Sequence, residues 1–244
     1  MEQACFANEK VGDLVAADYR LATVFKKYGI DFCCGGGKTL KAASEAKGID
    51  LEVIEKELAS AITQRDTSGL SDAARWSLDF LADYIVNVHH RYIRETIPVL
   101  REFTRRVAMV HGMGNPEVVE IARLFEELSV ELEDHIAEEE QVLFPYIKEL
   151  VAAEKNGSPV ASPDFGSADN PIGAMEHDHD RAGELMHQIR DLSGNYTPPE
   201  HACNTYRVSF AKLEEFEDDL HRHVHLENNI LFPRAIALEK RLAA

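Results

Sequence analysis

Apolar residues recur every three or four positions along almost the whole chain, and no run alternates apolar and polar residues with a period of two. This spacing places the apolar side chains on one face of an α-helix, so the sequence predicts an all-α protein. Four long helices are expected, at about residues 77–110, 115–155, 170–193 and 197–242. Four helices of this length favour an up-down four-helix bundle.

Three of these helices are predicted to begin where a small polar residue precedes a proline, at Asn115, Asn170 and Thr197. Proline suits the first helical turn, because its missing N–H has no partner there. The segment NGSPVASPDFGSADN at 156–170 is expected to be a loop, since it is rich in turn-forming residues. Kinks are expected inside the helices, because proline removes one backbone hydrogen bond. The prolines concerned are Pro98, Pro145 and Pro233.

The first part of the chain is expected to form a small domain of short helices. These helices are predicted to begin at Asp13 or Asp18 and end at Tyr28, and to span residues 39–47 and 50–61. The polar segment QRDTSGLSD follows them and is typical of a turn-rich boundary. We therefore predict a small helical domain over residues 1–63, a linker over 64–76 and the four-helix bundle over 77–244.

The composition excludes several classes of partner. The chain of 244 residues has 43 acidic and 26 basic side chains, a formal net charge of −17. This balance argues against a nucleic-acid or anionic-membrane partner, because both require a basic face. No segment has the length of a transmembrane helix, and the N-terminus lacks the regions of a signal peptide. The four cysteines show no disulfide or zinc-module spacing, so a reducing cytoplasm is expected.

One sequence motif occurs twice in the predicted bundle. It reads HIAEEEQVLFP at 135–145 and HVHLENNILFP at 223–233, so that in each copy a histidine precedes a glutamate by four positions. Four positions are about one helical turn, and both side chains therefore share a face. That face is otherwise apolar in both helices, which indicates that the histidine and the glutamate point into the bundle core.

Each of the four predicted helices directs at least one histidine towards the core, and two of them add a glutamate. One buried histidine is usual, but two buried glutamates would cost several kcal/mol unless something paired with their charge. A pair of metal ions removes that cost, with the glutamates as bridges and the imidazoles as terminal ligands. Iron, manganese and zinc suit such ligands, and the two-metal count favours iron. The predicted ligands are His90, His135, Glu139, His179, His223 and Glu227.

The neighbouring histidines are expected to face solvent or to support the ligands from outside, because one or two residues turn a helix by about 100° or 200°. They are His89, His177, His221 and His225. Among the acidic residues, Glu131 lies one turn before His135 and is expected to support it. Glu138 and Glu140 are expected to face water.

These motifs resemble the hemerythrin-like domain, through the repeated motif, the segment EHDHDRAGEL and the histidine before RYIRETIPVL. The segment YGIDFCCGGGKTL is similar to the short domain that precedes it in one group of proteins. Together they resemble the iron–sulfur cluster repair di-iron proteins, the RIC (repair of iron centres) family, over nearly the whole chain. The resemblance implies the same six ligands around two iron ions, bridged by Glu139 and Glu227 and by an oxo or hydroxo group. It favours His90 over His89, because His90 keeps the family's eight-residue step to Pro98.

The resemblance implies repair of iron–sulfur clusters damaged by oxidative or nitrosative stress, through donation of iron to iron–sulfur proteins. A centre without thiolate ligands would release iron readily to a thiolate-rich acceptor. Two alternatives remain open: a di-iron enzyme that reduces nitric oxide or peroxide, and a sensor of O2 or nitric oxide or an iron store. A second His–Glu arm departs from the oxygen-carrying hemerythrins, which argues against reversible oxygen carriage. The sequence allows a homodimer.

The segment DFCCGGGKTL places Cys33 and Cys34 beside three glycines, which predicts exposed thiols on a flexible backbone. A relay that passes iron or nitric oxide is one interpretation, and a redox pair is another, although a disulfide between adjacent residues would be strained. A tight turn with two half-buried thiols is the third. The family resemblance favours a functional role for this pair.

Overall fold

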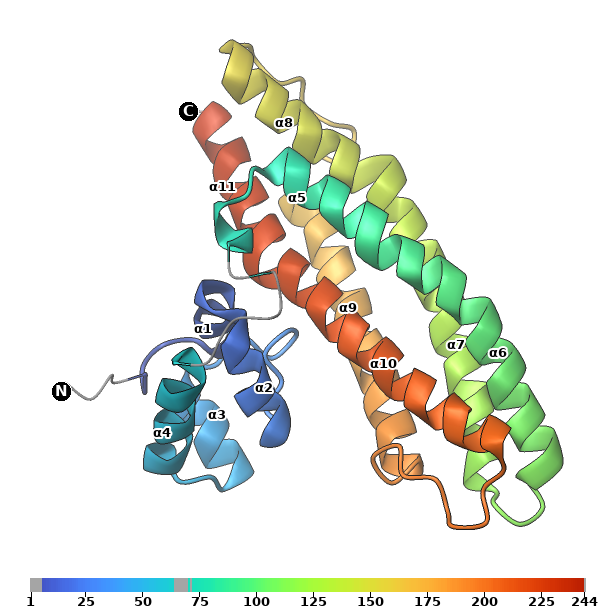
Figure 1. Cartoon of the computed structure of the whole chain (residues 1–244). Coiled ribbons are helices and arrows are strands. Elements are labelled where there is room, and N and C mark those ends of the chain that lie inside the picture. The colour runs from blue at the N-terminus through green and yellow to red at the C-terminus, as the bar shows by residue number, and fades with distance from the viewer. Residues whose placement is uncertain (1–5, 64–69, 71, 244) are drawn as a thin grey trace.

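The computed structural model describes residues 6–63, 70 and 72–243, and these residues form an all-α protein (Figure 1). Among them there is no β-strand, and an isolated antiparallel bridge joins Lys10 to Thr39. None of the described helices is both long and apolar enough to cross a membrane. The predicted all-α fold is therefore confirmed.

The N-terminal part consists of short helices around an apolar core. Asp18, Thr39 and Asp50 cap three of them, because each side chain accepts a hydrogen bond from a backbone N–H of the first turn. The third α-helix ends at Gly48, whose φ of 67° is favourable for glycine. The elements are α1 (Val11–Ala17), the 3-10 turn η1 (Tyr19–Leu21), α2 (Ala22–Lys27), α3 (Leu40–Lys47) and α4 (Leu51–Ile62). The 3-10 turn η2 (Ala73–Arg75) follows within the predicted linker, and its Ala73 packs with the apolar core of the bundle.

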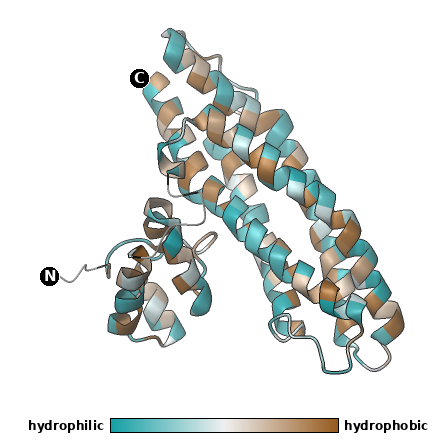
Figure 2. Cartoon of the chain, viewed as in Figure 1, coloured by the Kyte–Doolittle hydropathy of each residue, from teal (hydrophilic) through white to brown (hydrophobic). Residues whose placement is uncertain are grey.

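Four long helices, three of them interrupted by a π-helical turn, run up and down to form the bundle (Figure 1). Each bundle helix carries both hydrophobic and hydrophilic residues (Figure 2), as amphipathic helices do. The first two are α5 (Leu78–Ile85), η3 (Val86–His90) and α6 (Arg91–His111), and α7 (Glu117–Glu138), η4 (Glu139–Leu143) and α8 (Phe144–Asn156). The others are α9 (Asp169–Leu192), and α10 (Asn204–Leu226), η5 (Glu227–Leu231) and α11 (Phe232–Leu242).

The predicted start of the fourth helix at Thr197 is wrong, because α10 begins at Asn204. Pro198 precedes a second proline, and a residue before proline is disfavoured in the α-helical region. Asn195 and Tyr196, just upstream, have positive φ values of 55° and 57°, so the chain forms a turn there. The other three bundle helices begin and end within two residues of the prediction.

The π-helical turns η3, η4 and η5 were not expected from the sequence. Two of them begin at Glu139 and Glu227, and the third ends at His90, so each contains a predicted metal ligand. A π-helical turn adds a residue to the helical turn and redirects the side chains that it carries. Pro145 and Pro233 follow η4 and η5 by two residues, inside helices that continue past them; the kinks expected there stay predictions.

The N-terminal part packs on the fourth bundle helix, where α1 contacts α10 and η5 (Figure 1). The loop at residues 31–38 contains Cys33 and Cys34 and is called the cysteine loop. The backbone N–H of Gly12 donates to the carbonyl of Gly36 at 2.8 Å, which joins α1 to this loop. A Cβ on Gly12 would lie 2.2 Å from Oδ1 of Asn229, so this contact requires glycine. Part of the predicted linker, residues 64–69 and 71, lies outside the described residues; the domain boundaries stay predictions.

Candidate metal centre

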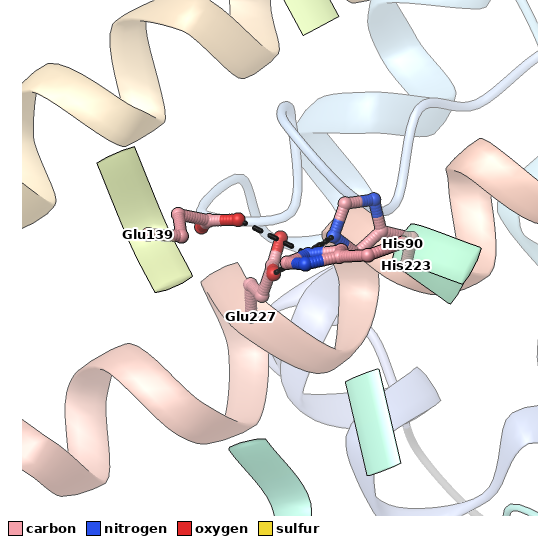
Figure 3. A group of neighbouring side chains, drawn as sticks. All are labelled: His90, Glu139, His223 and Glu227. Carbon is pink, nitrogen blue, oxygen red and sulfur yellow. Dashed lines mark hydrogen bonds and ion pairs between the residues drawn. The ribbon is translucent and has the colours of Figure 1, made fainter. Parts of the chain in front are cut away.

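The structure brings the six predicted ligands together in the middle of the bundle. They form two overlapping groups, and within each group the ligand atoms lie within 4.8 Å of one another. All six side chains are buried. The first group is His90, Glu139, His223 and Glu227 (Figure 3), and the second is His135, Glu139, His179 and Glu227.

Each glutamate presents one oxygen to each pair of histidines. Oε2 of Glu139 lies 3.3 Å from Nε2 of His90, and its Oε1 lies 3.5 Å from Nε2 of His135. Oε1 of Glu227 lies 2.8 Å from Nε2 of His223, and its Oε2 lies 3.3 Å from Nε2 of His179. Two adjacent positions result, the His90–His223 position and the His135–His179 position, and both carboxylates span them.

In their neutral form, the imidazoles of the cluster can present lone pairs to its centre. Nδ1 of His135 donates to Asp178 at 3.3 Å, and Nδ1 of His179 donates to Oδ1 of Asn228 at 2.8 Å. In the neutral rings, Nε2 is then the acceptor nitrogen. The two Nε2 atoms lie 3.0 Å apart, and those of His90 and His223 lie 3.1 Å apart. Two lone pairs at such distances repel unless a proton lies between them or a metal cation lies beside them.

Three of the four carboxylate oxygens of the cluster form no hydrogen bond with the described residues. Both oxygens of Glu139 and Oε2 of Glu227 are buried without a hydrogen-bond partner in the part of the chain that the structure describes. A buried carboxylate without hydrogen bonds is costly unless a positive charge is close. Four imidazole lone pairs and two carboxylates around two positions fit a pair of iron, manganese or zinc ions.

The electrostatics of the cluster favour positive charge. Burial lowers the pKa of His90, but the carboxylates of Glu139 and Glu227 outweigh it and raise the pKa to about 10. Burial also lowers the pKa of His179, and Glu227 overcomes this effect and raises it to about 9. Burial lowers the pKa of His223, the other ring of the first pair. In the absence of metal, the cluster therefore attracts protons to the place where cations would bind.

Side chains outside the cluster orient three of the four imidazoles. Nδ1 of His90 donates to Oε1 of Glu140 at 2.8 Å, and Arg94 pairs with the same oxygen at 2.9 Å. Such partners hold a ligand ring in place and strengthen it as a donor. The expectation that Glu140 faces water is therefore wrong: the π-helical turn beginning at Glu139 directs its carboxylate towards His90.

The histidines next to the ligands are less exposed than expected. His89 is buried, faces the Asp219 carboxylate at 3.1 Å and stacks on His223 with an interplanar angle of 11°. His225 is buried, and its Nδ1 accepts a hydrogen bond from Asn229 at 3.0 Å. His221 is half-buried, and His177 faces solvent. Three of these four rings therefore pack inside the protein.

Glu131 does not occupy the supporting position that the sequence suggested. Its side chain is 42% exposed and lies 3.7 Å from Nε of Arg181 on α9. Its carboxylate stays hydrated at the surface beside this guanidinium. The free-energy cost of keeping the charge there is lower than it would be beside the buried ring of His135. The acidic partner of His135 is instead Asp178.

The cysteine pair lies beside the cluster of candidate ligands. The Asp31 carboxylate accepts hydrogen bonds from the backbone N–H groups of Cys33, Cys34 and Gly35, at 3.0, 3.0 and 2.8 Å. The expectation of two exposed thiols is wrong, because this turn buries Cys33 and half-buries Cys34. Their Sγ atoms lie 3.9 Å apart, so both thiols are free. Cys34 Sγ lies 3.5 Å from the carbonyl oxygen of His179.

Comparison with known proteins agrees with this geometry. A model of the hemerythrin HHE cation binding domain matches residues 81–235, and the ScdA_N domain, a domain of unknown function, matches residues 7–62. The chain is 33% identical over 231 residues to the probable iron–sulfur cluster repair protein of Haemophilus influenzae, covering 95% of this chain and 98% of that relative. It is 37% identical over 235 residues to the iron–sulfur cluster repair protein YtfE of Citrobacter koseri, covering 96% and 99%. The chain therefore belongs to the family of iron–sulfur cluster repair proteins that carry a hemerythrin HHE cation binding domain.

Proposed function

We propose that the protein holds two iron ions in this cluster and repairs damaged iron–sulfur clusters by donating iron to them. The observation that carries the proposal is the pair of buried carboxylates, each of which presents one oxygen to each pair of imidazoles. Glu139 and Glu227 would bridge the two ions, and an oxo or hydroxo group would complete the centre. His90 and His223 would be terminal ligands of one ion, and the remaining two histidines of the other.

The ligand chemistry supports release of the metal. Imidazole and carboxylate ligands bind ferrous iron less firmly than thiolates do, so a thiolate-rich acceptor can remove it. The cysteine loop beside His179 offers soft ligands close to the cluster, which favours a relay role for Cys33 and Cys34. The client would be an iron–sulfur protein whose cluster has lost iron after exposure to peroxide or nitric oxide.

The six ligands would also serve an enzyme that reduces nitric oxide or peroxide, or a sensor or store. The cysteine loop next to the cluster favours donation, because turnover at a buried centre does not require thiols beside it. The free cysteines Cys33, Cys34 and Cys203 fit a reducing compartment such as the cytoplasm.

A repair assay tests the proposal. The iron-loaded protein is mixed with a dehydratase whose iron–sulfur cluster has been damaged by peroxide, and recovery of dehydratase activity is followed. We expect recovery with the native protein and with a Glu131→Gln control, and none with Glu227→Leu. Recovery that is absent, or equal with Glu227→Leu, contradicts the proposal. Many turnovers of nitric oxide without loss of iron would favour the enzyme instead.

A further inference from the structure

The cysteine loop packs against the helical turn that carries His179. Cys34 Sγ lies 3.5 Å from the His179 carbonyl oxygen. One turn further along α9, a Cβ on Gly183 would lie 3.7 Å from the same sulfur. The loop therefore lies on the His135–His179 side of the centre.

Two successive asparagines of η5 connect this loop to the centre. Nδ2 of Asn228 donates to the carbonyl oxygen of Cys33 at 3.5 Å, while its Oδ1 accepts from Nδ1 of His179 at 2.8 Å. Nδ2 of Asn229 donates to the carbonyl oxygen of Phe32 at 3.1 Å. Asn228 thus contacts both the loop and a ligand ring, and it directly follows the bridging residue Glu227 in the chain.

The two metal positions are supported differently from outside. His90 donates to the Glu140 carboxylate, which Arg94 holds in turn, whereas Nδ1 of His223 is buried without a hydrogen-bond partner among the described residues. His179 donates to the neutral amide of Asn228. A carboxylate partner makes an imidazole a stronger metal ligand than an amide partner does, because its negative charge adds to the donor strength of the ring. His135 has a carboxylate partner, Asp178, but at 3.3 Å and with a side chain that is 48% exposed.

We infer, building on the proposed two-iron centre, that the two positions differ in task. The His135–His179 position gives up its iron first, in the direction of Cys34, and Asn228 sets the rate of that release by orienting His179. The His90–His223 position holds its ion more firmly. Asn228 is thus a positioning residue that acts through a ligand.

The surroundings of Cys34 can receive a ferrous ion. Ligand atoms of Asp31, Cys33 and Cys34 lie within 4.8 Å of one another. These residues line a pocket of about 550 Å³ between the N-terminal part and the helices α9 and α10. The ion would exchange imidazole and carboxylate ligands for two thiolates, and the two thiol protons would pass to the ligands it leaves or to water. No electron is transferred in this exchange.

Release kinetics test the inference without measuring repair. The full-length protein is loaded with two ferrous ions per chain and mixed with ferrozine, and the coloured complex is followed in time. We expect two phases of equal amplitude. Asn228→Ala should accelerate the fast phase about tenfold, the usual lower range for loss of an orienting partner. Asn228→Asp should slow it, because a carboxylate then supports His179.

Two controls separate this role from a general loosening of the protein. Asn229→Ala removes the neighbouring link to the loop without touching a ligand of either position, so the fast phase should change less than twofold. Glu140→Gln should accelerate the slow phase alone. A single phase for both ions overturns the inference, as does equal acceleration of both phases by Asn228→Ala, or acceleration by Asn228→Asp. A protein that binds less than one iron per chain contradicts the proposed centre itself.

Discussion

The metal-free protein is expected to lose stability as the pH rises from 7 to 9. Burial opposes the protonation of His90 and His179, but the carboxylates prevail and raise their pKa values to about 10 and about 9. An unfolded histidine has a pKa of about 6.5. The stability that these protons contribute is therefore complete below pH 6.5, and it is lost as the pH rises through the two folded values.

The magnitude follows from the number of protons that only the folded protein binds. Between pH 7 and 9 each of the two imidazoles holds a proton that the unfolded chain has lost. The free energy of unfolding then falls by about 1.4 kcal/mol per pH unit for each ring. About 5 kcal/mol across the two units is an upper limit, because the two protonated rings repel each other.

Urea unfolding of the metal-free protein at pH 7, 8 and 9, followed by circular dichroism, measures how steeply the free energy of unfolding falls with pH, which is the slope of its pH dependence. Glu139→Gln should flatten it, since the amide no longer favours a protonated ring. Iron-loaded protein should lack the slope, because metal binding requires imidazoles without that proton. A free energy of unfolding that stays constant or rises from pH 7 to 9 in the metal-free protein would refute the reasoning.

Two further predictions concern the cysteine loop. The Cys34 thiol, burial and Asp31 together raise the pKa of Cys33. In a background without the other two cysteines, iodoacetamide at pH 8 should therefore modify Cys34 before Cys33; mass spectrometry of the labelled peptides that showed the reverse order would contradict the described burial. Gly12→Ala should destabilise the protein by about 1–3 kcal/mol, because its Cβ would overlap the amide of η5. In Gly37→Ala, no described atom lies within 4 Å of the added Cβ, so urea unfolding should show a much smaller change.

The bundle and the convergence of the six candidate ligands could be predicted because both depend on helical periodicity. His135 and Glu139 are four residues apart, as are His223 and Glu227, and each pair lies on an apolar face. Helical geometry converts such spacing directly into a shared face. The two glutamates predicted on core faces beside histidines then favoured a metal site over isolated buried histidines.

The supporting residues could not be predicted in the same way. Glu140 and Asn228 directly follow Glu139 and Glu227, and a regular helix would turn each of them about 100° away from the preceding residue. The π-helical turns η4 and η5 change these directions, and no sequence pattern used for the prediction announces such a turn. The predicted start of α10 was wrong for a different reason. Pro199 disfavours a helical conformation at Pro198, so the helix does not begin there as it would after a single proline.

The position of the N-terminal part depends on contacts between residues far apart in the chain. Asn229 fits between Gly12 and Gly36, and Asn228 reaches the carbonyl of Cys33, across about 200 residues of sequence. Neither contact follows from local propensity or from periodicity. The cysteine pair therefore had three open interpretations in the sequence, and the structure places it in a turn around Asp31, beside the carbonyl of His179.

The iron content of the purified protein tests the central claim most directly. The protein is loaded with ferrous iron without oxygen, freed of unbound metal and analysed for iron per chain. We predict two iron ions per chain for the native protein, and fewer than one after Glu139→Leu or Glu227→Leu. Less than one iron per chain in the native protein, unchanged by either substitution, would contradict a two-iron centre bridged by these glutamates.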